Sequence, residues 1–93
     1  FHIDHGFGTV IGSRSSIGKG FWMHHGCTIG HKNMEDIGLG PEIGDDVIVY
    51  ANSQVLGSIK LGNKVVVAAN SLVICDVEDC QIVGGSPSKV LHV

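Results

Sequence analysis

Apolar residues recur at every sixth position along most of this chain. From Ile11 to Ile29 an aliphatic residue or Met stands at each such position, and the spacing resumes at Ile43 and runs to Val73. We call these residues anchors, and glycine follows many of them. A period of six fits neither a helix nor a simple amphipathic strand. It predicts short strands separated by tight corners.

A second position lies four residues after most anchors and is small or apolar. It is occupied by Ser15, Phe21, Cys27, Val47, Ser53, Ile59, Val65, Ser71 and Val77. If three hexads make one turn, residues 18 apart stack, anchors point inward, and successive turns pair as parallel strands about 4.8 Å apart. A Gly-rich β-sandwich is the alternative, and it is disfavoured because its strands do not keep one strict register over successive hexads.

The repeat has one interruption. Fourteen residues separate Ile29 from Ile43, where two hexads would take twelve, so residues 31–41 are expected to leave the wall as an inserted loop. Loops on rigid scaffolds commonly carry function. Counting anchors from position 5 to Val73 predicts an all-β column of a little under four turns, with residues 82–93 as a closing tail.

Composition narrows the possible classes of protein. The 14 glycines disfavour helices, where each costs about 1 kcal/mol relative to Ala. A net charge of -3 with scattered basic residues disfavours nucleic-acid binding, and the lack of a long apolar run disfavours a membrane span. Three cysteines without CxxC spacing favour a reducing, cytoplasmic location over disulfides or structural zinc. The start at Phe1 suggests the C-terminal part of a longer parent.

The hexad of aliphatic anchor, Gly, two free residues and a small residue resembles the hexapeptide-repeat transferases, whose prism is a single-stranded left-handed parallel β-helix. Within that group, the segment from Asp4 to Gly12 is similar to the Asp-His-Ala-Thr-Gly-x-Val-x-Gly motif of serine acetyltransferases and their polysaccharide-modifying relatives. The segment from Val83 to Val90 is similar to their terminal Gly-x-Pro-Ala-Lys/Arg motif. The resemblance implies an O-acetyltransferase that uses acetyl-CoA and no metal, and a homotrimer that holds acetyl-CoA between adjacent prisms.

Transfer of an acetyl group to a hydroxyl needs a base that takes the hydroxyl proton, and His can do so at neutral pH. His5, in the Asp-His-Gly context, is the predicted general base, and it occupies an anchor position where an aliphatic residue is expected. Asp4 either binds the acceptor or is a solvated carboxylate at a corner. The transfer is expected to be direct, without a covalent enzyme intermediate.

The resemblance also implies a coenzyme site. The pantetheine arm would lie along a groove lined by the small corner residues Ala51, Gly57 and Ala69, and Lys89 would neutralise coenzyme phosphates. Simple corner packing remains the alternative for the three small residues, and ordinary solvation the alternative for the lysine.

Histidines near the loop suggest where the acceptor binds. His25 and His31 are predicted to line its pocket or to decorate two adjacent corners. Together with His24 they raise a zinc alternative, because γ-class carbonic anhydrases hold zinc with three histidines on such prisms. The separations of one, six and seven residues differ from the spacing of five in those enzymes.

The chain departs from the serine acetyltransferase pattern in the loop, which there ends Asp-Arg-His-Pro with its His in the active site. Here Gly40 stands in place of that His. This favours a sugar or polysaccharide hydroxyl over free serine as acceptor. A non-catalytic assembly module is the alternative from another class, and coenzyme binding separates the two.

Overall fold

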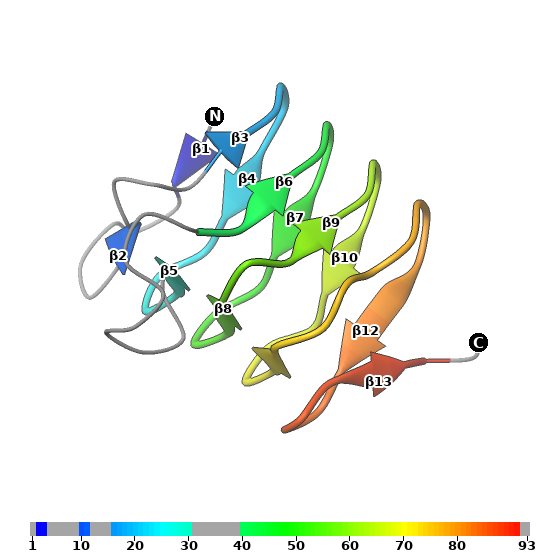
Figure 1. The fold of residues 1–93 in the computed structure, drawn as a ribbon. Helices are drawn as coiled ribbons and strands as arrows, with labels where there is room; N and C mark the ends of the chain where they lie inside the picture. Colours follow the sequence, from blue (N-terminus) through cyan, green and yellow to red (C-terminus); the bar gives the residue numbers. More distant parts are fainter. Residues whose placement is uncertain (1, 4–9, 12–15, 31–39, 92–93) are drawn as a thin grey trace.

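The computed structural model describes residues 2–3, 10–11, 16–30 and 40–91. In these ranges the chain forms short strands of two or three residues, which stack as the three walls of a triangular column (Figure 1). Successive turns follow one another from the N-terminal to the C-terminal end of the column. Within the same ranges, no helix has the length and apolarity to cross a membrane.

Each wall is one sheet, and each of the first three turns gives one strand to each wall. Sheet A has the order β1-β4-β7-β10-β12-β13, comprising His2–Ile3, Trp22–Met23, Ile48–Val49, Val66–Val67, Ile82–Gly84 and Lys89–Val90. Sheet B has the order β11-β8-β5-β2, comprising Leu72–Val73, Gln54–Leu56, Thr28–Gly30 and Val10–Ile11. Sheet C has the order β3-β6-β9, comprising Ser16–Ile17, Glu42–Ile43 and Lys60–Leu61.

The core lies inside the column and confirms the predicted period. The described anchors from Met23 to Val73 are all buried, and so are the second positions from Phe21 to Val77. Residues 18 apart pair where predicted, as Val49 does with Val67 and Val55 with Val73. Neighbouring strands are parallel throughout, except that β13 returns antiparallel to β12.

The first turn departs from the predicted register. Ile3 pairs with Met23, so Ile3 holds an anchor position of sheet A. Eight residues separate Ile3 from Ile11 in the sequence, two more than a hexad. His5 lies between them, outside the described residues, so its anchor position stays a prediction.

The insertion is larger than the sequence spacing suggested. Ile29 lies on β5 of sheet B and Ile43 on β6 of sheet C, which are consecutive walls, so six residues would have sufficed. The excess is 14 − 6 = 8 residues rather than two. Pro41 already stands in the wall, since its carbonyl accepts a hydrogen bond from the Ser16 amide at 3.0 Å. The bounds 31–41 stay a prediction, because residues 31–39 lie outside the described part.

The last turn is two residues short. Val77 bridges to Leu61, and Val83 pairs with Val67, so both steps take 16 residues instead of 18. Val77 thus fills the anchor place of sheet C. After Gly84 the chain reverses, and β13 closes the edge of sheet A.

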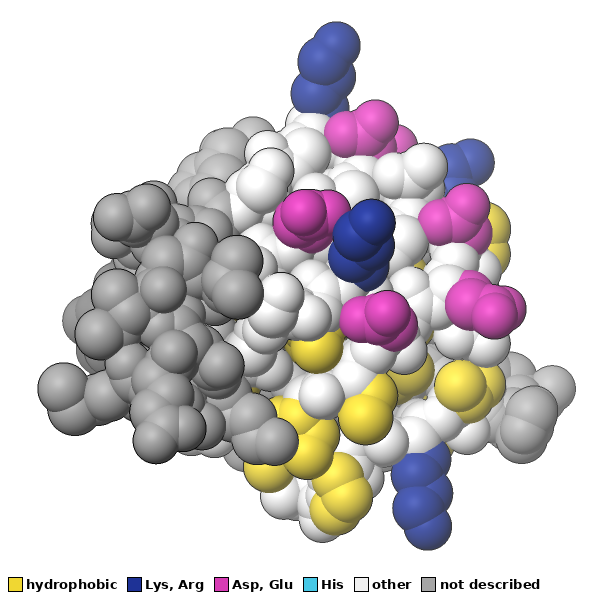
Figure 2. All heavy atoms as spheres, viewed as in Figure 1, with side chains coloured by type: hydrophobic (Ala, Val, Ile, Leu, Met, Phe, Trp, Pro, Cys, Tyr) yellow, Lys and Arg dark blue, Asp and Glu magenta, His cyan; other side chains and the backbone are white. Residues whose placement is uncertain are grey.

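The outer faces of the walls differ in chemistry. On sheet A the outward positions are the apolar Trp22, Ile48, Val66 and Ile82, of which Trp22 is 43% and Ile82 37% exposed. On sheet C they are Ser16, Glu42 and Lys60, with a Lys60–Glu42 ion pair of 3.7 Å. Figure 2 looks onto sheet C, where acidic and basic side chains gather.

Candidate functional site

Along the edge between sheets C and A, a side-chain oxygen of one turn accepts a hydrogen bond from a backbone amide of the turn before it. We call this arrangement the seal. This C–A edge comprises residues 18–21, 44–47, 62–65 and 78–81. The amide of Lys19 donates to Asp45 Oδ1 at 2.8 Å, the amide of Asp45 to Asn63 Oδ1 at 2.7 Å, and the amide of Asn63 to Asp79 Oδ1 at 2.7 Å. The outward amides of Lys19, Asp45 and Asn63 therefore each have an acceptor in the following turn.

Glycine lies under each of these oxygens. A Cβ at Gly18, Gly44 or Gly62 would collide with the side-chain oxygen that crosses above it and with the neighbouring backbone. The glycine that follows an anchor is thus paired with a residue of the next turn. It leaves room for the side chain of the Asp or Asn in that turn.

The edge between sheets A and B follows the same path without that seal. This A–B edge comprises residues 24–27, 50–53 and 68–71. The positions that correspond to Asp45 and Asn63 are Ala51 and Ala69, which have no oxygen to offer. Among the described residues, no hydrogen bond involves the amides of Ala51 and Ala69. The positions that correspond to the glycines carry side chains, and His24 stacks on Tyr50 with ring centroids 4.9 Å apart.

The two amides of Ala51 and Ala69 point out of the column because the carbonyl of the same peptide unit points in. The Tyr50 carbonyl accepts from the buried Cys27 Sγ at 3.2 Å, and the Ala68 carbonyl accepts from Ser53 Oγ at 2.8 Å. In a trans peptide the C=O and the following N–H point in opposite directions. The A–B edge therefore presents two outward donors, one per turn, about 4.8 Å apart.

A buried polar column backs this edge, and sequence reasoning did not single it out. It consists of Cys27, Ser53 and Ser71, all in second positions of the hexad and almost fully buried. At the C–A edge the same positions hold Phe21, Val47 and Val65. The detectable signal was that the second position is polar or thiol-bearing at every third hexad. Burial raises the pKa of the Cys27 thiol, which keeps it protonated as a donor.

The structure brings together only some of the predicted site residues. His25, Ala51 and Ala69 lie on the A–B edge in successive turns: the Asn52 amide donates to the His25 carbonyl at 3.0 Å, and the Asn70 amide to the Ala51 carbonyl at 2.9 Å. Lys89 pairs with Gly84, beyond Ala68 at the end of this edge.

Gly57 lies apart from the two alanines. It sits on the edge between sheets B and C, where its amide donates to the Gly30 carbonyl at 2.9 Å. One groove of a single chain along the A–B edge therefore does not include it. Asp4, His5 and His31 lie outside the described residues, and their roles stay predictions.

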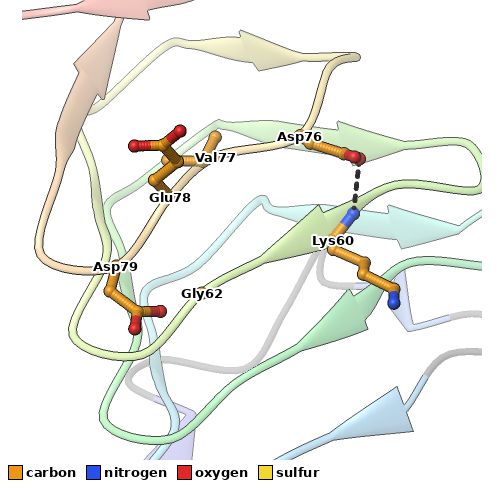
Figure 3. A pocket seen from close by; sticks show the side chains of 6 residues that line it. All are labelled: Lys60, Gly62, Asp76, Val77, Glu78 and Asp79. Carbon is orange, nitrogen blue, oxygen red and sulfur yellow. Dashed lines mark hydrogen bonds between the residues drawn. The ribbon is translucent and has the colours of Figure 1, made fainter.

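A shallow pocket lies elsewhere, on sheet C and the last part of the C–A edge. It is lined by Lys60, Gly62, Asp76, Val77, Glu78 and Asp79 (Figure 3). The Asp76 carboxylate accepts from the Lys60 amide at 2.9 Å, and Asp79 completes the seal described above. Two of its carboxylates thus hold backbone amides, and the pocket contains none of the predicted site residues.

The histidines give no metal centre within the described part of the chain. There, no group of three or more His, Cys, Asp or Glu side chains is arranged to hold a metal ion. His24 is stacked on Tyr50, and His25 is half-buried on the A–B edge. The third histidine of the zinc alternative, His31, lies outside the described residues.

Comparison with known proteins adds to this geometry. The family model for bacterial transferase hexapeptide repeats (six repeats) matches residues 40–75. The chain is 40% identical over 91 residues to serine acetyltransferase 2 of Arabidopsis thaliana, covering 98% of this chain and 28% of that protein. It is 38% identical over 91 residues to the serine acetyltransferase of Bacillus licheniformis, covering 98% of this chain and 42% of that protein.

Solved structures give the same picture. A serine acetyltransferase of Neisseria gonorrhoeae superposes with a TM-score of 0.91 at 34% identity, over 97% of this chain and 34% of that one. A serine acetyltransferase in complex with CoA superposes with a TM-score of 0.87 at 27% identity, over 96% and 36%. The chain therefore spans well under half the length of these relatives.

The stacked hexads, the family match over residues 40–75 and the superposition on solved structures define the fold, a left-handed parallel β-helix of hexapeptide repeats. Within that fold the chain is serine acetyltransferase-like in both sequence and backbone.

Proposed function

We propose that this chain forms the catalytic prism of an acetyl-CoA-dependent O-acetyltransferase. The observation that carries the proposal is the pair of outward amides at Ala51 and Ala69, on a prism that superposes on a serine acetyltransferase solved with CoA. The relatives' names favour serine as the acceptor, over the sugar hydroxyl that Gly40 suggests. Serine is therefore the first acceptor to test and a sugar hydroxyl the second.

The A–B edge fits an extended thioester arm. The pantetheine arm of CoA carries two amide groups, whose carbonyl oxygens are acceptors for backbone N–H donors. Ala51 and Ala69 offer such donors in successive turns, and their methyl groups leave the approach open. Lys89, exposed at the end of this edge, supplies a positive charge for the phosphates.

The reaction needs one proton transfer. The acceptor oxygen attacks the thioester carbonyl carbon, a C–O bond forms, the C–S bond breaks, and the acceptor proton passes by way of the base to the CoA sulfur. His5 is the proposed base, supported by its Asp-His-Gly motif. His5→Ala should abolish turnover while acetyl-CoA still binds. Near-normal turnover in that variant would refute the assignment.

A homotrimer would meet through sheet A. Its outer wall is apolar from Trp22 to Ile82, whereas that of sheet C is charged, and apolar surface of this kind favours association of copies. A neighbour on sheet A would also flank the adjoining A–B edge. Ile48→Lys should give a smaller species by size exclusion with light scattering, and Gln54→Lys on sheet B should not. An unchanged mass for both variants would refute this interface.

The test of the function is calorimetric titration of the protein with acetyl-CoA and with CoA. Saturable binding to both is expected, followed by CoA release with serine detected by a thiol reagent. Binding without turnover on serine or sugars would leave a coenzyme site and remove the transferase assignment. A folded oligomer that binds neither coenzyme would be an assembly module.

A further inference from the structure

One peptide unit on the A–B edge accepts more side-chain hydrogen bonds than its counterpart one turn earlier. The carbonyl of Ala68 accepts two buried hydroxyls, from Ser53 Oγ at 2.8 Å and from Ser71 Oγ at 2.6 Å. Both serines are almost fully buried, at 0% and 2% exposure. The other end of that peptide unit is the outward amide of Ala69. The two hydroxyls thus fix the direction of a donor that they do not touch.

The two serines are themselves held in place. Ser53 Oγ accepts from the Ser71 amide at 3.2 Å, and Ser71 Oγ accepts from the Gly85 amide at 3.2 Å. The chain of bonds therefore runs through three successive turns inside the A–B edge. Linked hydrogen bonds polarise one another in a low-dielectric interior, so a carbonyl that accepts two of them makes its peptide N–H a stronger donor.

One turn earlier, the side-chain hydrogen bond to the corresponding carbonyl is weaker. The Tyr50 carbonyl accepts from the Cys27 thiol at 3.2 Å, and thiols are weak donors. The amide at the other end of that peptide unit belongs to Ala51. The two outward donors are therefore held with unequal strength, and Ala69 is the better fixed.

The fold does not require hydroxyls at these positions. The corresponding places on the C–A edge hold Val47 and Val65, which are fully buried in the same register. Polar second positions occur, within the described ranges, only along the edge that has the outward amides. Valine fills the equivalent places there without a hydroxyl, so the packing of the column alone does not explain the serines.

We propose that Ser53 and Ser71, with Cys27 in a lesser role, are positioning residues for coenzyme binding, because they orient and polarise the outward amides of Ala69 and Ala51 toward the pantetheine arm. This inference rests on the proposed function for its ligand. The positioning of the amides is itself a property of the free protein.

The experiment compares the double variant Ser53→Ala/Ser71→Ala with the control Val65→Ala, which removes core volume from the same register on the C–A edge. Calorimetry is done with CoA and with 3′-phosphoadenosine 5′-diphosphate, the nucleotide half of CoA that lacks the arm. The double variant should bind CoA roughly five- to tenfold more weakly and the nucleotide half as before. The control should bind both ligands as the wild type does.

Ser71→Cys provides the conservative rescue, because a thiol already serves at Cys27, and it should recover part of the affinity for CoA. If the double variant is poorly folded, this variant and Ser53→Cys carry the test. Their affinity for CoA should then lie measurably below that of the wild type. Equal losses for CoA and the nucleotide half, or no loss for CoA in any serine variant, would overturn the inference.

A measurement without ligand separates this inference from the proposed function. In amide proton spectra of the free protein, the Ala69 signal should move upfield in the Ser71→Ala variant and stay in place in Val65→Ala. If the wild type binds no CoA, the proposed function fails and this signal alone judges the positioning. An Ala69 signal that does not respond to loss of the serine hydroxyls would overturn it.

Discussion

The A–B and C–A edges follow the same path through the column but differ in what surrounds their outward backbone amides. Both turn outward amides toward solvent, once in each turn. On the C–A edge, Asp45, Asn63 and Asp79 accept those hydrogen bonds from above, and glycine below makes room. On the A–B edge, alanine stands in place of the acceptor and the glycine is no longer needed. Buried serine hydroxyls there donate hydrogen bonds to the inward-pointing carbonyl of Ala68. One edge is capped by its own side chains, and the other presents two amides that have no acceptor among the described residues.

The largest expected effect breaks the sealed edge. In Gly62→Ala the new methyl group would overlap the side chain and backbone of Asp79, and such overpacking costs about 2–3 kcal/mol. Its A–B counterpart, position 68, already carries alanine, so Ala68→Gly should cost less than about 1 kcal/mol. Urea unfolding of both variants measures the difference. If the two variants lost the same free energy of unfolding, the pairing of Gly62 with Asp79 of the next turn would be contradicted.

The next prediction converts the open edge into a sealed one. Ala69→Asn with Tyr50→Gly recreates the Asn63–Gly44 arrangement, so the new side chain should accept the Ala51 amide. We expect about a tenfold loss of CoA affinity with stability retained, because one donor is taken from the ligand. Ala69→Asn alone should lose less, since the Tyr50 side chain obstructs the cap. The reverse order of the two variants in calorimetry would show that the amide is not the contact.

A smaller effect opens the sealed edge. Asn63→Ala removes the acceptor of the Asp45 amide, which then faces water, and should cost about 1 kcal/mol in unfolding free energy. Asn63→Asp retains the oxygen and should stay close to the wild type. If Asn63→Asp is as unstable as Asn63→Ala, the seal does not depend on that hydrogen bond.

The smallest effect concerns backbone conformation on the C–A edge. Lys64 has a φ of 59°, in the region that Asn and Asp tolerate better, and Asp46, Asn52 and Asn70 hold the equivalent turn positions. Lys64→Asn should therefore stabilise the protein by about 0.5 kcal/mol. Lys60→Asn, on strand β9, should bring no gain. A loss of stability in Lys64→Asn would mean that the lysine makes a compensating contact.

The period of six was sufficient to predict the walls, because anchors such as Met23 and Val67 must reach the core once per face. A strict period does not reveal extra residues between strands, and eight residues separate Ile3 from Ile11 where a hexad has six. For the same reason the spacing from Ile29 to Ile43 concealed an excess of eight residues. Only the pairing of Ile43 with Ile17 and Leu61 reveals which wall it occupies.

The candidate site was predictable only where side chains mark it. Ala51, Ala69 and His25 lie on one edge, whereas Gly57, which was grouped with the two alanines, lies on another, and the roles of all four stay predictions. The donors of the A–B edge are backbone amides, and a sequence does not show which backbone amides lack an acceptor. The trace that they leave is indirect: alanine where the other edge has Asp or Asn, and Tyr50 where it has glycine.

The direction of the C–A seal has a consequence for how the chain is made. Each cap reaches back to the turn before it, as Asn63 does to Asp45 across 18 residues. A turn that has just left the ribosome therefore waits for the next one, and at about 5–20 residues per second this delay is roughly one to four seconds. Each turn gains its caps only when the next turn has formed, so the newest turn of a nascent chain is always the one that lacks them.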